Sequence, residues 1–199
     1  MMTRRYLIMP LFAALVFVGA CETSGPKPEP EPTYEEAAMY QFTATNHQAA
    51  DRLLAGYGAA VPYTASVSNF SSPGGGGTIL VATLADVSRL EHSSPFGRII
   101  SEQLVSRIAQ NGRSVVEMKL RGSVFVQNNN GEFLLTREVR ELASSQNAGA
   151  VLVGTYAESG RFVFISLKLV NPADSLVLSS HDYTLPIDRV VRRLLSERR

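Results

Sequence analysis

The sequence predicts an α/β fold: a single mixed β-sheet that begins with a β-α-β unit, continues as an antiparallel meander and has helices packed on it. Predicted strands at 78–87 and about 113–119 flank an amphipathic stretch of helical period that follows Ser93-Ser94-Pro95. Three strand-like runs then follow with short turns between them, at about 150–157, 161–170 and 175–184. A crossover helix indicates parallel pairing of the strands it joins, whereas short turns indicate antiparallel pairing.

The first predicted element of the domain is a helix over 35–56. Its mainly apolar stripe consists of Met39, Phe42, Asn46, Ala49 and Leu53. Glu35 and Glu36 suit the positive end of the helix dipole, and Gly56 and Gly58 are expected to end the helix. Because the apolar face needs a partner, we expect this helix to belong to the domain.

A glycine-rich segment, Ser71 to Gly77, precedes the first strand. Phosphate-binding loops run from a strand into a helix N-terminus and usually supply a lysine. Here the glycines lead into a strand and no lysine follows. The segment therefore predicts a mobile loop rather than a nucleotide site.

The helix after the first strand is predicted to start with capping serines and Pro95 and to end at Asn111-Gly112. Its apolar face consists of Phe96, Ile99, Ile100, Leu104 and Ile108. Farther on, the runs 124–126 and 133–135 flank Asn128 to Gly131, which predicts a β-hairpin because Asn-Gly accepts positive φ. Thr136 is expected to cap a helix that holds Val139, Leu142 and Ala143.

The C-terminal part predicts a meander and a closing helix. Ala150 to Val153 is wholly apolar and predicts a strand buried on both faces, and Gly154 predicts a place where something packs closely. Residues 161–169 partly alternate, so one face of that strand is expected to be solvated. The closing helix has an apolar stripe at Ile187, Val190, Val191, Leu194 and Leu195, opposite Arg189, Arg192 and Arg193.

The N-terminus predicts a bacterial lipoprotein signal peptide over 1–20. Two arginines precede the apolar run Leu7 to Val18, and Val18-Gly19-Ala20 leads into Cys21, the single cysteine of the chain. The run is too short to span a hydrocarbon core of ~30 Å, and an uncleaved anchor or a chance cysteine is the alternative. We expect cleavage before Cys21 and acylation of its thiol. Residue 22 is glutamate rather than aspartate, which favours the outer membrane, with the domain facing the periplasm.

The residues after Cys21 predict a proline-rich tether over 21–33 and a domain over 34–199. Proline at positions 26, 28, 30 and 32 blocks helix and favours polyproline II, which would reach roughly 35 Å at ~3.1 Å per residue. The mature chain would carry 17 basic and 18 acidic side chains. A near-neutral domain argues against a nucleic-acid binder, which needs a concentrated basic stripe.

No motif of a reaction centre is found in the sequence. His47, His92 and His181 share no metal-ligand spacing, and we expect neither a metal nor a cofactor. No G-x-S-x-G motif occurs, and Asp182 follows His181 directly, so that their side chains would point to opposite faces of a strand. The sequence predicts a protein that is not an enzyme. The arginines near the C-terminus predict a solvent-exposed helix face. The alternative is that they contact an acidic partner protein or peptidoglycan.

Several segments resemble the FlgO domain of flagellar outer-membrane lipoproteins. They are Ile79 to Asp86, Ser94 to Arg98, Gly131 to Glu138, Ala150 to Tyr156, Leu169-Val170 and Ser175 to Leu178, in this order behind the lipoprotein signal. The resemblance covers about 78–187. The same segments are more distantly similar to the N-terminal domain of TolB and to envelope lipoproteins of the LpoB and CsgG type.

The resemblance implies a non-enzymatic outer-membrane lipoprotein with a structural or assembly role in the rings around the flagellar basal body, and hence in motility. It implies as partners the outer membrane, through the lipid on Cys21, and flagellar ring or other envelope proteins. A homo-oligomer within a ring is left open. The alternative is a periplasmic adaptor of the TolB or LpoB kind that serves other envelope machinery. No catalytic residue comes with the resemblance.

Overall fold

A computed structural model of the protein describes residues 41–60, 77–118, 124–127 and 133–196. The helices within these residues are α2 (Phe42–Ala60), α3 (Pro95–Gln110), α4 (Arg137–Ser145) and α5 (Arg189–Leu195). The strands are β1 (Thr78–Ala82), β2 (Ala85–Asp86), β3 (Val115–Met118), β4 (Phe125–Gln127), β5 (Phe133–Leu135), β6 (Ala148–Ser159), β7 (Phe162–Val170) and β8 (Val177–Pro186).

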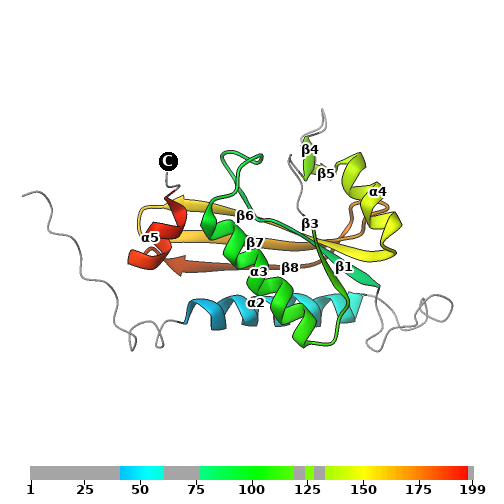
Figure 1. Cartoon of the computed structure of the whole chain (residues 1–199), viewed down its shortest axis with the longest axis horizontal. Helices are drawn as coiled ribbons and strands as arrows, with labels where there is room; N and C mark the ends of the chain where they lie inside the picture. The colour runs from blue at the N-terminus through cyan, green and yellow to red at the C-terminus, as the bar shows by residue number, and fades with distance from the viewer. Residues whose placement is uncertain (1–40, 61–76, 119–123, 128–132, 197–199) are drawn as a thin grey trace, which may run out of the picture. The chain divides into compact units, whose positions relative to one another are not determined.

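Six of these strands form one mixed sheet in the order β3-β1-β6-β7-β8, with β2 also paired to β6 (Figure 1). β1 is parallel to both neighbours, and Val81 lies opposite Glu117 of β3 and Leu152 of β6. β6, β7 and β8 run antiparallel, so that Gly154 lies opposite Leu167. α3 is the crossover helix between the first strand and β3. The predicted fold class is confirmed, including the β-α-β start and the antiparallel meander.

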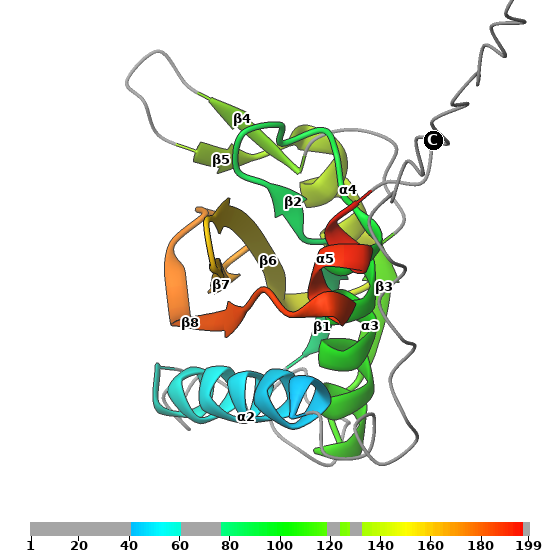
Figure 2. The ribbon, with the colours of Figure 1, turned by 90° about the vertical axis from the view of Figure 1, so that its left-hand side faces the viewer.

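The larger core lies between one face of the sheet and the helices α2, α3 and α5 (Figure 2). Leu152 and Ile165 from the sheet and Phe96 from α3 are fully buried there. α2 contributes Phe42, Ala49, Ala50, Leu53, Leu54 and Tyr57 to the same core. The predicted membership of this helix in the domain is therefore confirmed.

The described residues cover only part of the opposite face of the sheet. Val139 and Ala143 of α4 and Leu135 of β5 pack there. They contact a second core that includes Leu80, Ala82, Val151, Val153 and Val170. Ala150 to Val153 are thus buried on both faces, as predicted, and β7 alternates between buried and exposed residues, also as predicted.

The predicted end of the first helix is wrong, because α2 continues through Gly56 and Gly58 to Ala60. A Cβ atom on Gly56 would collide with the Ser179 hydroxyl of β8. The glycine is therefore needed where α2 lies against β8, and the packing outweighs its cost of about 1 kcal/mol within a helix. The predicted residues 35–40 of this helix lie outside the described residues.

The predicted strand 78–87 is interrupted between β1 and β2, and Leu84 turns into the core. The Leu84 amide donates a hydrogen bond of 2.9 Å to the Ser101 hydroxyl of α3, which compensates for the lost ladder bond. Ser94 is the N-cap residue of α3 and Pro95 begins the helix, as predicted, but the Ser94 side chain makes no capping hydrogen bond. The Ser94 amide donates to the Tyr156 hydroxyl at 2.9 Å, and that hydroxyl donates to Ser94 Oγ at 2.8 Å.

Other local predictions are confirmed. α3 ends before Asn111, and Gly112 has a φ of +72°. Thr136 caps α4, and its hydroxyl accepts from the Val139 amide. β4 and β5 form the predicted antiparallel hairpin, although in a two-stranded sheet of their own. The predicted turn at 128–131, the glycine segment up to residue 76, the signal peptide and the tether lie outside the described residues.

The closing helix is shorter than its predicted stripe. Val191 of α5 is fully buried, whereas Val190 faces solvent. Ile187, Leu194 and Leu195 pack against the larger core. The Asp188 carboxylate caps the helix by accepting a hydrogen bond of 2.8 Å from the Val191 amide. None of the helices in the described residues is both long enough and apolar enough to cross a membrane.

Candidate functional site

The three histidines lie on separate elements: His47 on α2, His92 in the loop between β2 and α3, and His181 on β8. Within the described residues no group of three or more metal-ligating side chains comes together. His181 stacks on Tyr183 with ring centroids 5.9 Å apart. Burial lowers the pKa of His181, and Arg52 lowers it further, whereas Asp182 raises it. These positions bring no two histidines into a shared site.

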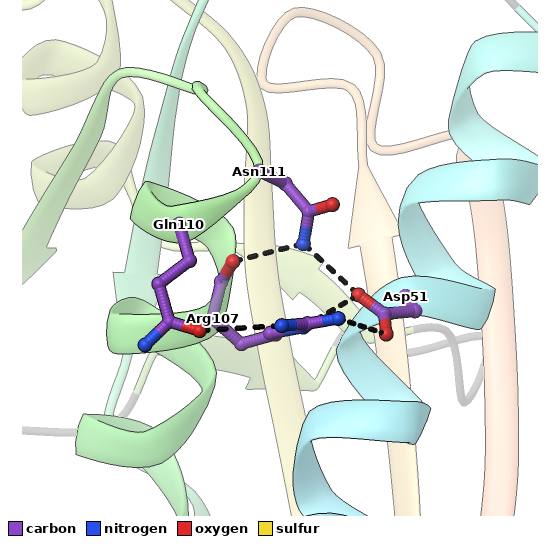
Figure 3. A network of polar contacts seen from close by, with 4 residues as sticks. All are labelled: Asp51, Arg107, Gln110 and Asn111. Carbon is purple, nitrogen blue, oxygen red and sulfur yellow. Dashed lines mark hydrogen bonds and ion pairs between the residues drawn. The ribbon is translucent and has the colours of Figure 1, made fainter.

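A charged network joins α2 to α3 (Figure 3). Arg107 of α3 donates to both oxygens of Asp51 on α2, from Nε at 2.9 Å and from Nη2 at 2.8 Å. Asn111 Nδ2 donates to the same carboxylate at 2.9 Å, and Arg107 Nη1 donates to Gln110 Oε1 at 3.3 Å. The hydrogen bond from the Arg107 guanidinium holds the pKa of Asp51 below its ordinary value, with Asn111 adding to the effect.

A second polar chain runs from β8 through α2 to α3. The Tyr183 hydroxyl donates to Asn46 Oδ1 at 2.6 Å, and Asn46 Nδ2 donates to Gln103 Oε1 at 2.6 Å. Burial raises the pKa of Tyr183 well above its ordinary value, so this hydroxyl stays protonated and able to donate. Both networks satisfy their own donors and acceptors, and their chemical role is to fix α2 between β8 and α3.

Replacing Asp51 by asparagine is expected to lower the free energy of unfolding at pH 7 by roughly 0.5–1 kcal/mol, the upper part of the range for partly exposed ion pairs. The lowered pKa of Asp51 stabilises the fold above the unfolded pKa of about 3.9, and this stabilisation disappears as pH falls through the folded pKa. Urea unfolding at pH 7 and near pH 3 measures the difference. Glu141→Gln, which removes an exposed pair with Arg137 within α4, is the matched control and should cost less. A deficit of Asp51→Asn that does not shrink as the pH falls from 7 to 3 would contradict a stabilising role for the ionised Asp51 carboxylate.

The uncovered part of the second sheet face is hollowed. A cavity of about 230 Å³, the outer groove, lies between the loop after β2 and the start of β8. Its lining includes Val87, Leu90, Thr155, Ser166, Lys168 and Val177. It continues across β7 and β8 as an open hollow that includes Phe164, Asp182 and Thr184. In the views of Figures 1 and 2, α2 and α3 lie on the other side of the sheet.

Lys168 carries the only charge among the described residues that line the outer groove. It makes no ion pair with any residue that the structure describes. Asp182 lies one strand away, opposite Ser166 and diagonal to Lys168. Aliphatic walls with a few polar groups are the usual composition of a binding pocket, and this arrangement suits binding rather than bond-making chemistry.

The sequence did not point to the outer groove. Lys168 and Phe164 belong to the strand for which the sequence predicts alternation, but alternation alone does not show whether another element covers their face. The prediction for Gly154 is confirmed: a Cβ there would lie 2.8 Å from Leu167 Cδ2 and 2.9 Å from Leu84 Cγ. The arginines of α5 are partly or largely exposed, and none of them forms an ion pair with another residue that the structure describes.

A protein-family model described as FlgO protein matches residues 47–190. The chain belongs to the FlgO family. The match begins in α2 and ends in α5, so it includes the whole sheet and the outer groove. The predicted resemblance is confirmed and extends farther toward the N-terminus than the expected 78–187. No curated protein sequence matches the chain.

Three solved structures illustrate what this FlgO-family chain is similar to in fold. The LpoB C-terminal domain from Salmonella enterica is 11% identical, with 73% of this chain and 98% of that chain covered and a TM-score of 0.47. The PelC dodecamer from Paraburkholderia phytofirmans is 18% identical, with 59% and 78% covered and a TM-score of 0.39. A lipoprotein from Neisseria meningitidis is 16% identical, with 55% and 82% covered and a TM-score of 0.37.

Proposed function

We propose that this FlgO-family protein is a non-enzymatic lipoprotein of the outer membrane with a structural or assembly role in flagellar basal-body rings. The observation that carries the proposal is the family match over residues 47–190. Membership of this family supports an envelope lipoprotein as the general class of the protein. The flagellar role is the finer part of the proposal and follows from what the FlgO resemblance implies.

The anchor and its geometry belong to the same proposal. Acylated Cys21 would hold the chain at the inner leaflet, because each buried methylene contributes about 0.8 kcal/mol and stable anchoring takes more than one acyl chain. Residues 21–33 would act as a semi-rigid polyproline spacer that carries the domain into the periplasm. The protein would then act by position and by contact with envelope proteins.

Cys21→Ser is expected to abolish both anchoring and function. The hydroxyl cannot be processed as the lipoprotein cysteine is, so the protein should leave the outer-membrane fraction and incorporate no labelled palmitate. In a strain that lacks the native protein, swimming in soft agar should fall to the level of the deletion. Thr23→Ser, a conservative change two residues farther on, is the matched control and should preserve fractionation and swimming.

The outcomes separate the parts of the proposal. Palmitate labelling and outer-membrane fractionation of Cys21→Ser would contradict the anchor. Normal swimming after complete deletion would remove the flagellar role and favour the adaptor of other envelope machinery. Co-purification of the protein with isolated basal bodies would support the ring assignment directly.

A further inference from the structure

We propose that the outer groove is the docking site for a segment of a partner protein. An apolar side chain of this segment inserts between Val87 and Val177, and a carboxylate of the same segment pairs with the ammonium group of Lys168. The proposal rests on the proposed function, since a lipoprotein that acts by position needs a surface that contacts its partner. It adds to that function the location of the surface and the chemistry of the segment that fits it.

Exposed apolar side chains gather around the outer groove. Val87 is 52% exposed and Val177 is 53% exposed, one on each side of it. Phe164 on β7 lines the open continuation and is 50% exposed, and Phe162, which is 49% exposed, lies two residues away on the same face of the strand but outside the lining. Monomeric proteins rarely collect such side chains into one patch, and a patch rimmed by polar residues marks an interaction site.

The charge of the outer groove selects an acidic occupant. Lys168 has no carboxylate partner among the described residues, and none of the described residues that line the cavity around it is acidic. A carboxylate that replaced water on this ammonium group would form a charge-assisted hydrogen bond, which is shorter and stronger than one between neutral groups. Asp182 lines the open continuation and not the cavity around Lys168, so a carboxylate bound within the cavity is the one that Lys168 can pair with there.

The polar groups along the groove favour a polypeptide over an acyl chain. Thr155 and Ser166 lie on its floor, and Thr184 lines its open continuation. A hydrocarbon chain laid over these hydroxyls would remove their water and offer no hydrogen bond in return. A peptide supplies backbone donors and acceptors to them while one side chain fills the apolar part.

The test is photo-cross-linking in the native cell with the full chain, using p-benzoylphenylalanine in place of Val177. The control places the same group at Ser106, an exposed position of α3 on the other side of the sheet. The expected product at position 177 is one partner protein, joined at a peptide in which an apolar residue stands within two residues of a carboxylate. The control position should not give this product.

A synthetic peptide of the cross-linked sequence then tests Lys168 by calorimetry with the full chain in lipid nanodiscs. Lys168→Gln should raise the Kd about tenfold or more, because a loss of 1.4 kcal/mol corresponds to a factor of about ten. Lys168→Arg should restore much of the affinity. Arg140→Gln, which removes an exposed charge on α4, should leave the Kd unchanged. Thermal unfolding of each variant checks that the fold is intact.

Several outcomes would overturn the proposal. A cross-link to lipid or to a second copy of this chain would assign the groove to another occupant. Equal cross-linking from positions 177 and 106, or equal effects of Lys168→Gln and Arg140→Gln, would show that no specific docking occurs. These outcomes test only the docking site. The proposed function is tested separately by the swimming and the membrane fractionation of the Cys21→Ser variant, which do not involve the groove.

Discussion

Replacement of Phe96 by alanine is expected to lower the free energy of unfolding by about 3–5 kcal/mol, the range for truncation of a buried aromatic side chain. Phe96 has no exposed surface and stands at the junction of three elements. Its ring meets Phe42 of α2 edge-on, with centroids 6.0 Å apart, and Tyr156 of β6, with centroids 5.3 Å apart. The truncation would therefore open a cavity and remove two aromatic contacts together.

Equilibrium unfolding in urea measures this effect, and a large loss is expected relative to a typical total stability of about 5–15 kcal/mol. Phe164→Ala is the matched control, because the same side chain is removed from a half-exposed position on β7. We expect the control to cost less than about 1 kcal/mol. Equal losses in the two variants would show that the Phe96 contacts are not part of a tightly packed core.

Leu152→Ala is expected to cost about 2–5 kcal/mol. Leu152 is fully buried in β6, at the centre of the sheet between β1 and β7. It lies opposite Val81 and Leu169, and helices cover the face on which it packs. Because backbone pairing holds β6 on both sides, the surroundings have little freedom to collapse into the space that the truncation leaves.

The thermal midpoint and the urea midpoint should both fall for Leu152→Ala. Leu176→Ala, at a position that is 63% exposed, is the control and should change the stability by no more than about 0.5 kcal/mol. Midpoints of Leu152→Ala that match those of the unchanged protein would contradict the prediction that this strand is buried on both faces.

The sequence alone determined the elements whose cause is local. The five-residue stripe that starts at Phe96 predicts α3 because helical period brings its members onto one face. Thr136 caps α4 through an amide three residues away, and Gly112 ends α3 through its own backbone conformation. The order of these elements, with a crossover helix first and short turns later, was sufficient to predict the mixed sheet.

Only the tertiary structure decided where residues distant in the chain meet. Gly56 remains helical because β8 approaches it, and the Ser94 hydroxyl binds Tyr156, 62 positions away, instead of capping α3. In the sequence, Asp51 and Arg107 look like ordinary surface charges. They form an ion pair only because α2 packs against α3. The outer groove likewise exists because α4 and the hairpin cover only part of one face. A sequence pattern encodes which side of a strand is apolar, but the extent to which another element covers that side depends on packing between distant segments.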